Sequence, residues 1–505
     1  MKTSIIARRA VILAVTALSL YACKTIMPTD DAARLSHELE QASALQKASK
    51  PAEANELISS VIVDPAFSSL SPALQHRALQ FAAFFSAQHG ERDRAYELIT
   101  RSSTMTISDE NDWILRFKLA EIRHDDADKV YSLTRLAQGW PSALHWIPYP
   151  SVQAAVGAAR DVPEKEFDLL QALFAARYVS DLGIELSGLW RDLALLCLQR
   201  GDQNAALAAV ERIASGSILM GVQVDNRFAG VRARLHDPIN VDAAMADEIR
   251  SWQTAVSRNP DRLEPLLGLT RLQIAAGQSE QALYELDNVI ARMGVQAQEG
   301  NLYKDQERDY VWILQRRTDA LYGLSRFDEA VKQQEAASRV HESGHPNVNQ
   351  TINLAELYND LGRPSDARGA LDRVGPATVS SYGRMQIEIE RLKAALQLND
   401  AREVTRCMTY LREHQSDSIA TYELALVQTG DMVNAKQLLL TRLADPQQRI
   451  DALIAAQDYV QHTRTEPVSE RRARWRAVVT APEVRAAIAK VGVIERFNFD
   501  GPENY

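Results

Sequence analysis

The sequence predicts an all-α protein built as a solenoid of helical hairpins. Composition is the first reason, because 46% of the 505 residues are hydrophobic, only 7% are aromatic, and leucine and alanine dominate the apolar set. Such a composition favours helices over sheets. The second reason is a repeat of glycine turns and small packing residues along the chain. The length exceeds that of one ordinary core, so several units or an extended array are expected.

Residues 1–22 have the layout of a secretory signal peptide. Lys2, Arg8 and Arg9 give a basic start, and an apolar run follows from Ala10 to Leu20. This run is short for a permanent membrane-spanning helix, so export and cleavage are expected.

The apolar run ends in Leu20-Tyr21-Ala22-Cys23, which resembles the lipobox of bacterial lipoproteins. The resemblance implies that Cys23 receives a diacylglyceryl thioether and becomes the first residue of the mature chain. Tyr21 departs from the pattern, which prefers a small residue there. Lys24 stands where lipoproteins retained in the inner membrane typically have aspartate, so the resemblance implies an outer-membrane anchor facing the periplasm. The alternative is an unmodified Cys23.

A repeat of small residues runs through the later part of the chain. Ala367, Ala401 and Ala435 follow one another at intervals of 34 residues, and Gly362 and Gly430 are twice that interval apart. Glycine supplies the positive φ that a turn between helices needs, and alanine lets two helices cross closely. A fixed period of this size is typical of a helical solenoid. The predicted turn and packing residues are Gly201, Ala206, Gly277, Ala282, Ala330, Gly362, Ala367, Ala401, Gly430 and Ala435.

The most regular unit, residues 348–381, resembles a tetratricopeptide repeat (TPR). The residues that match the register of this family are Leu354, Ala355, Tyr358, Gly362 and Ala367. The resemblance implies that the first helices of successive hairpins line a concave face, which would bind a peptide or a partner helix.

These patterns predict five parts. Residues 1–22 are the signal peptide, and residues 23–50 are the lipidated N-terminus with a flexible tether. Residues 51–186 form an irregular helical, TPR-like region. The TPR array covers 187–462, with an irregular break near 216–262. Residues 463–505 form a capping helix and a tail that cover the end of the array.

One stretch has the spelling of a zinc peptidase motif, H-E-x-x-H, at His341, Glu342 and His345. The motif works when one helix places both imidazoles on the same face. Here Gly344 weakens a helix and Pro346 disfavours the helical region at the residue before it. The repeat register also places the motif on a turn between hairpins. The sequence therefore predicts no metal and no cofactor, with zinc catalysis as a disfavoured alternative.

The net charge of −9 does not build the positive field that nucleic-acid binding needs. The chain has no glycine-rich phosphate loop and no G-x-S-x-G nucleophile turn. We therefore expect a non-enzymatic, membrane-anchored periplasmic scaffold that binds other envelope proteins or peptides. By resemblance, it would be a subunit or assembly factor of an envelope biogenesis or secretion machine. The alternatives are a soluble periplasmic regulator and the zinc peptidase.

Overall fold

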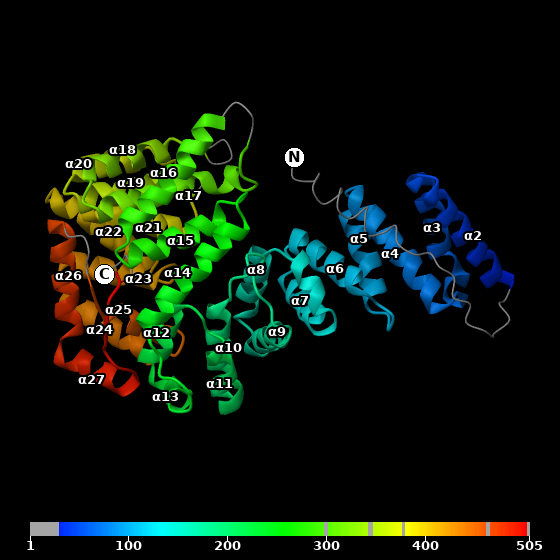
Figure 1. The fold of residues 1–505 in the computed structure, drawn as a ribbon, viewed down its shortest axis with the longest axis horizontal. Helices are drawn as coiled ribbons and strands as arrows, with labels where there is room; N and C mark the ends of the chain where they lie inside the picture. The colour runs from blue at the N-terminus through cyan, green and yellow to red at the C-terminus, as the bar shows by residue number, and fades with distance from the viewer. Residues whose placement is uncertain (1–29, 297–300, 342–346, 376–378, 461–464, 502–505) are drawn as a thin grey trace. The chain divides into compact units, whose positions relative to one another are not determined.

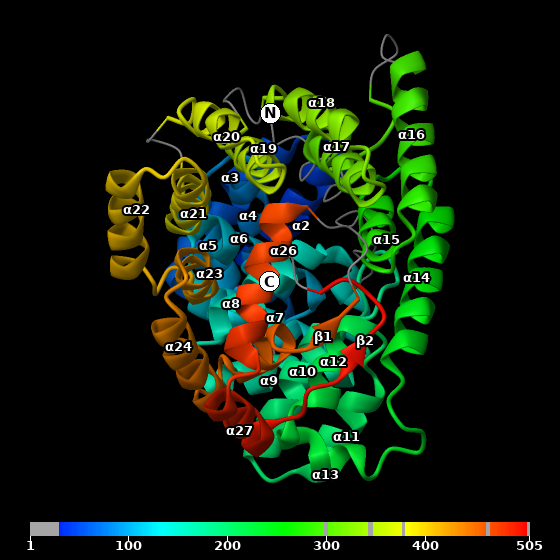
Figure 2. The ribbon, with the colours of Figure 1, turned by 90° about the vertical axis from the view of Figure 1, so that its left-hand side faces the viewer.

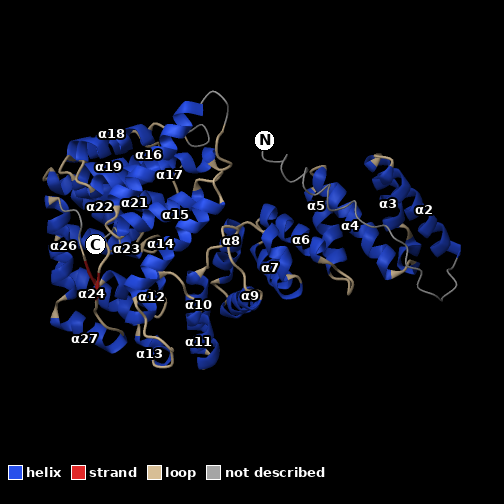
Figure 3. Cartoon of the chain, in the orientation of Figure 1, coloured by secondary structure: helices blue, strands red, loops and turns tan. Residues whose placement is uncertain are grey.

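The computed structural model describes residues 30–296, 301–341, 347–375, 379–460 and 465–501. These residues are mostly helical, and the strands among them are β1 (Asp458–Tyr459) and β2 (Arg496–Phe497), as Figure 3 shows. Successive helices pack as antiparallel hairpins (Figure 1), which confirms the predicted all-α, helical-hairpin solenoid of the TPR-like kind. The chain divides into two compact units, residues 1–181 and 182–505, called unit 1 and unit 2. Among the described helices, none combines the length and apolarity needed to cross a membrane.

Unit 1 is a series of short hairpins, in which α2 pairs with α3, α4 with α5 and α6 with α7. Its elements are α2 (Asp30–Lys47), α3 (Pro51–Val63), the 3-10 helix η1 (Pro65–Ser69), α4 (Pro72–Gln88), α5 (Arg92–Ser103), α6 (Glu110–Arg123), α7 (Asp126–Gly139), the 3-10 helix η2 (Pro141–Trp146), α8 (Tyr149–Ala159) and α9 (Pro163–Ala175).

The first helix of unit 1 corrects the expected flexible tether over residues 23–50. Residues 30–47 form α2, which packs against α3. Leu35, Leu39 and Ala42 follow one another at i, i+4 and i+7, so they fall on one side of the helix and join the core of unit 1. The predicted lipidation site, Cys23, and the predicted signal peptide lie outside the described residues.

The hairpins of unit 1 are more regular than the sequence predicted, because other residues fill the turn positions. Gly90 has a φ of 80° and is followed five residues later by the fully buried Ala95. His124 takes the same left-handed conformation, with a φ of 56°, and Lys129 occupies the buried position five residues on. The turn geometry at Gly90 therefore recurs at His124, although neither glycine nor alanine stands at the corresponding positions there.

Unit 2 contains the main array. Its helices are α10 (Ser187–Gln199), α11 (Gln203–Glu211), α12 (Gly216–Val224), the 3-10 helix η3 (Asn226–Phe228), α13 (Ala229–Arg232), α14 (Val241–Arg258), α15 (Glu264–Ala275), α16 (Ser279–Gln296), α17 (Gln306–Gly323), α18 (Phe327–Ser338), α19 (Val348–Asp360), α20 (Pro364–Leu371), α21 (Ser381–Gln397), α22 (Ala401–Glu413), α23 (Ile419–Thr429), α24 (Met432–Ala444), α25 (Arg449–Ala455), α26 (Glu466–Val479) and α27 (Pro482–Val491).

Five hairpin turns of unit 2 share one local rule: a residue with positive φ is followed five positions later by the buried residue where two helices cross. The glycines of this kind, with φ between 69° and 77°, are Gly201, Gly277, Gly362 and Gly430. The residues five positions after them, all fully buried, are Ala206, Ala282, Ala367 and Ala435. Ser325, with a φ of 58°, takes the glycine's place before the buried Ala330.

Ala401 does not follow this rule, which corrects its predicted role as a packing residue. It is exposed and begins α22, whereas the positive φ of the preceding turn belongs to Asn399. Five residues after Asn399 stands Val404, which is partly buried against the adjacent core. The interval of 34 residues at Ala401 is therefore coincidental, because α21 is longer than the first helix of the neighbouring hairpins.

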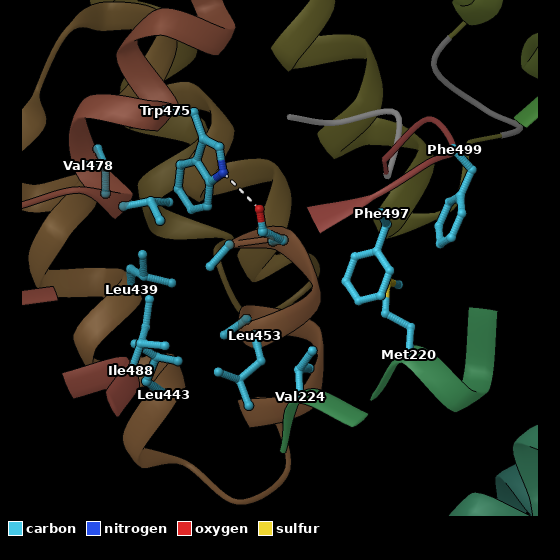
Figure 4. Close-up of a cluster of buried hydrophobic side chains, with 14 of the residues drawn as sticks. Met220, Val224, Leu439, Leu443, Leu453, Trp475, Val478, Ile488, Phe497 and Phe499 are labelled. Atoms are coloured by element: carbon cyan, nitrogen blue, oxygen red, sulfur yellow. Dashed lines mark hydrogen bonds between the residues drawn. The ribbon is translucent and has the colours of Figure 1, made fainter. Parts of the chain in front are cut away.

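The predicted break near 216–262 is a packing site for the C-terminal end of unit 2. One hydrophobic core joins residues of α12, α14 and α15 to residues of α23 to α27 and the tail after them. Figure 4 shows Met220 and Val224 beside Leu453 and Phe497 in this core. The main-chain N–H of Val493 donates to the carbonyl of Val224, and β2 pairs in parallel with β1. The end of the array therefore returns to its own beginning.

Two glycines allow this close return. A Cβ on Gly492 would lie 2.4 Å from the carbonyl oxygen of Val224, and one on Gly216 would lie 2.6 Å from the main-chain nitrogen of Met245. Side chains at these positions would push the elements apart, so both glycines serve backbone approach rather than a turn.

Candidate partner-binding groove

The predicted concave face corresponds to the first helices of the hairpins in unit 2. In Figure 2, α17, α19, α21 and α23 lie around α26, which runs through the middle of the arc they form. Helix α26 contacts α19, α23 and α24. The inner surface of the array is therefore covered by a helix of the same chain.

The inner surface carries a cluster of carboxylates that we call the acidic wall: Asp319 of α17, Glu356 and Asp360 of α19, and Glu390 of α21. Burial raises the pKa of Asp319 and of Glu390 above the usual range of a carboxyl group. Both groups are held by cations on neighbouring positions. Arg316 Nη1 lies 2.7 Å from Asp319 Oδ2, and the partner of Glu390 is a lysine.

That lysine, Lys393, is itself buried. Its Nζ lies 2.6 Å from Glu390 Oε1 and 3.5 Å from Glu356 Oε1. Burial lowers the pKa of Lys393, but the two carboxylates outweigh burial and raise it overall. Lys393 thus stays positively charged at neutral pH. Arg316 and Lys393 pair with Asp319, Glu390 and Glu356, whereas the positive charge that pairs with Asp360 comes from outside α17, α19 and α21.

Helix α26 supplies this charge. Arg471 Nη1 lies 3.2 Å from Asp360 Oδ1, and the Arg471 side chain is only 5% exposed. Burial lowers the pKa of Arg471, but Asp360 and Glu356 raise it by more. The pKa of Arg471 is therefore raised overall, and the guanidinium remains charged. The inner surface holds a buried arginine against its carboxylates.

The rest of the buried side of α26 is apolar. Val468, Trp475, Val478 and Val479 are buried, and the indole Nε1 of Trp475 donates to the carbonyl of Ala455 at 2.9 Å, as Figure 4 shows. On the opposite side, Glu470, Ala473, Arg476 and Ala477 are exposed. Helix α26 therefore has one face on the array and the other in solvent, with arginine on the inner face and alanine among the exposed residues.

The fit of α26 on the array is uneven. The Nε of Arg471 is buried and has no hydrogen-bond partner among the described residues, and the same holds for the Oδ1 of Asn359, whose Nδ2 donates to Glu390 of α21. A buried polar group without a partner costs about 1–3 kcal/mol. By contrast, the segment from Trp475 onward belongs to the large core that closes unit 2. The contact is therefore weakest where the arginine meets the acidic wall.

This arrangement changes two expectations. The sequence predicted a concave face for a partner and a capping segment over residues 463–505. The structure places α26, the first helix of that segment, on the concave face. The periodicity contains the signal, because Val468, Arg471 and Trp475 stand at i, i+3 and i+7 and so share one side of a helix. An arginine at an apolar position of such a stripe indicates a buried carboxylate partner.

The residues of the zinc motif are only partly described. His341 is exposed and follows the end of α18, whereas Glu342 and His345 lie outside the described residues. Helix α19 begins at Val348, where the side chain of Asn347 accepts a hydrogen bond from the main chain and caps the helix. The zinc motif therefore stays untested.

Within the described part of the chain, two other groups of residues have the spacing of metal ligands, and both are engaged in structural contacts. In unit 1, the group is His76, Asp109 and Asp112. Asp112 accepts from His76 Nε2 at 2.6 Å and from Ser102 Oγ at 2.7 Å, and Asp109 accepts from Gln80 Nε2 at 2.8 Å and caps α6. The oxygens that would bind an ion already bind protein donors.

The second group, Glu264, Asp305 and Asp309, lies in unit 2. Arg308 Nη2 lies 2.6 Å from Asp309 and 3.2 Å from Glu264. Asp305 accepts from the main-chain nitrogens of Leu263 and Glu264 at the start of α15. The arginine and the helix N-terminus satisfy these carboxylates, so we assign them a structural role.

No family model matches the chain, and no curated protein matches it by sequence. Among solved structures, the chain is similar to yeast Tom70, with 10% identity, a TM-score of 0.31 and coverage of 91% of this chain and 100% of that one. It is also similar to the Cut9-Hcn1 assembly of the APC/C, with 11% identity, a TM-score of 0.28 and coverage of 91% and 90%. At these values the similarity says nothing about what this chain binds.

Proposed function

We propose that this chain is a protein-binding scaffold without catalytic activity. The observation that carries the proposal is the occupied groove of unit 2. An array of hairpins whose inner surface holds a helix by an arginine and an apolar stripe has the chemistry that recognises helical segments of other proteins. The fold alone would not support this, since one fold serves many functions.

The surface of unit 1 is where a partner is to be sought first. Among the described residues, seven of the twelve exposed large hydrophobic side chains lie in unit 1, which is the smaller unit. Val63 is 79% exposed and Tyr131 is 48% exposed. Contiguous apolar patches mark protein-binding surfaces, whereas single exposed apolar side chains are ordinary, so these two positions serve as probes of the unit 1 surface.

Photo-crosslinking in cells tests the scaffold role. A photoreactive amino acid at Val63 or Tyr131 should give discrete adducts with another protein, and the same amino acid at the exposed Ala401 of unit 2 is the matched control. Adducts of the same pattern and amount at all three positions, or at none, would count against a specific partner surface on unit 1.

We further propose that the scaffold is lipid-anchored at Cys23 to the outer membrane, faces the periplasm, and serves as a subunit or assembly factor in envelope biogenesis or secretion. The support is the signal-like segment and the lipobox-like sequence that ends at Cys23. Fractionation of the wild-type chain and a Cys23→Ala variant tests the anchor. The wild type should sediment with membranes and the variant should not. Equal membrane association of both would favour another mode of attachment, and solubility of both would favour a soluble periplasmic regulator.

The zinc peptidase is the remaining rival. It predicts one zinc ion per chain, held by the motif that contains His341. Metal analysis of the purified chain, with a His341→Ala variant as the control, tests this. A stoichiometric zinc ion that the variant loses would overturn the non-enzymatic proposal.

A further inference from the structure

We infer that α26 is an intramolecular ligand of the unit 2 groove, and that this groove binds a basic amphipathic helix from another protein when α26 is displaced. The inference rests on the proposed protein-binding function and extends it by naming the chemistry of the partner. The partner helix places an arginine against the acidic wall and an aromatic side chain one turn further along.

The first argument is the composition of the interface. A helix that serves only to cover the end of a solenoid needs an apolar side, and Val468, Trp475 and Val478 provide one. Arg471 adds nothing to such a cover, because burying a guanidinium requires a carboxylate to compensate it. The array provides Asp360 for this purpose, with Glu356 and Glu390 nearby. The groove therefore recognises a positive charge at one position.

The second argument is the way in which α26 is held. The elements that flank it are attached independently: β1 pairs with β2, and α27 packs on α24 and η3. Helix α26 itself is the segment between them. Its displacement withdraws Trp475 and Val478 from the closing core, whereas the contacts of β1 and α27 remain, so the hairpins of the array stay folded.

The third argument is the mismatch at the polar end of the contact. Arg471 Nε and Asn359 Oδ1 are buried without partners among the described residues. Arg471 Nε returns to water when α26 leaves the groove, and a partner helix that reaches the same carboxylates with a better-placed donor buries no unpaired donor of its own. It would then compete with α26, although α26 has the advantage of a tethered ligand, whose effective concentration is on the order of millimolar.

The consequence is a groove that is closed to weak ligands. A tethered competitor lowers the apparent affinity of any partner by the fraction of time that the groove is free. Only a helix that matches the arginine and the apolar stripe would open it. Weakening the hold of α26 should accordingly expose the binding site and raise affinity.

A synthetic peptide with the sequence of residues 465–480 serves as the probe, and its R471E version is the matched control. Both are titrated by fluorescence anisotropy into the full-length chain and its R471E variant. In that variant, a carboxylate at position 471 faces the acidic wall and releases α26. We expect the wild-type peptide to bind the variant at least about tenfold more tightly than it binds the wild-type chain, a difference of about 1.4 kcal/mol.

Reversing the charge of Asp360, on the groove side, tests its pairing with position 471 of the bound helix. In the chain with Asp360→Arg, the R471E peptide should bind more tightly than the wild-type peptide, which reverses the preference seen with the R471E chain. If neither peptide binds either variant, although both keep their helical circular dichroism, α26 is a permanent part of the core and the inference is wrong. Equal binding of both peptides to each variant would show non-specific adhesion and would also overturn it.

Hydrogen exchange on the wild-type chain keeps the inference testable if a variant fails to fold. Main-chain amides of α26 should exchange at least about tenfold faster than those of α23 and α24, because α26 opens without the array. Exchange of α26 only at the rate of α24 would refute displacement. Failure of these experiments would leave the crosslinks from Val63 and Tyr131 unaffected, so the scaffold function and the groove ligand are tested separately.

Discussion

Two glycines of unit 2 offer a sharp test of the repeat geometry. Gly430 ends α23 with a φ of 75°, whereas Gly369 lies inside α20. Both are exposed, and a methyl group at either position would meet no atom within 4 Å. Replacement by alanine therefore changes only the backbone preference and not the packing.

The expected effects have opposite signs. An alanine in the left-handed region costs about 1–2 kcal/mol, and the loss of freedom in the unfolded chain offsets about 0.4–1 kcal/mol of this. Gly430→Ala should therefore destabilise unit 2 by roughly 0.8 kcal/mol. In the helix interior of α20, Gly369→Ala should stabilise by about 0.5–1 kcal/mol.

Urea unfolding followed by circular dichroism at the helix band measures both variants. With a slope of about 3 kcal/mol per M urea, the midpoint should fall by about 0.3 M for Gly430→Ala and rise by a similar amount for Gly369→Ala. Equal slopes are required for this comparison. A neutral or stabilising Gly430→Ala would refute the assignment of a left-handed turn at that position, and with it the rule that relates the turn to the packing residue five positions later.

Three further predictions concern buried charge and packing. Arg442 and Glu423 form an ion pair with side chains 4% and 0% exposed. Glu423→Gln should lower the free energy of unfolding by about 3–5 kcal/mol, whereas the double variant with Arg442→Leu and Glu423→Met should lose far less. Equal losses of unfolding free energy for the two variants in urea would contradict this. Burial lowers the pKa of His76, but its aspartate partner outweighs burial and raises it above 6.5. The protonated form is thus favoured by folding, and its stabilisation is present below pH 6.5 and lost as pH rises through the raised pKa. The stability difference between wild type and His76→Gln should be larger at about pH 5.5 than at about pH 8.5, and a difference independent of pH would contradict the pairing. Finally, Ala367→Leu should destabilise by about 1–3 kcal/mol because the site is full, whereas Ala401→Leu at an exposed position should change stability by less than about 0.5 kcal/mol; thermal melts that rank them otherwise would contradict the assigned register.

The sequence was sufficient for the fold class because the repeat is a local property. A glycine with positive φ and an alanine five residues later determine one turn and one crossing, and both are visible in the residues themselves. The rule was harder to see where other residues fill the same conformations. Ser325, Asn399 and His124 all take positive φ, although none of them has the freedom of glycine. Ala401 stands outside the rule because a period counted from alanines ignores the length of the preceding helix, whose turn has its positive φ at Asn399.

The groove could not be predicted in the same way, because its occupant comes from a distant part of the chain. Arg471 and Asp360 are 111 residues apart, and no local pattern relates them. What the sequence does contain is an arginine within an apolar stripe. Such a residue predicts that a carboxylate lies opposite, but the position of that carboxylate depends on how the array curves.

The same reasoning explains why residues 216–262 looked like a break. Their regularity is completed by elements more than 200 residues later, since Val224 accepts a main-chain hydrogen bond from Val493. A hairpin that packs against the adjacent hairpins repeats their spacing of turn and packing residues. A segment that packs against the far end of the chain has its apolar residues where that end requires them. Positions 216 and 492 require glycine, because backbone atoms of other segments lie too close to each of them for a Cβ. Loss of the expected period within a solenoid can therefore indicate a long-range closure, and here the closure is what positions α26 against the acidic wall.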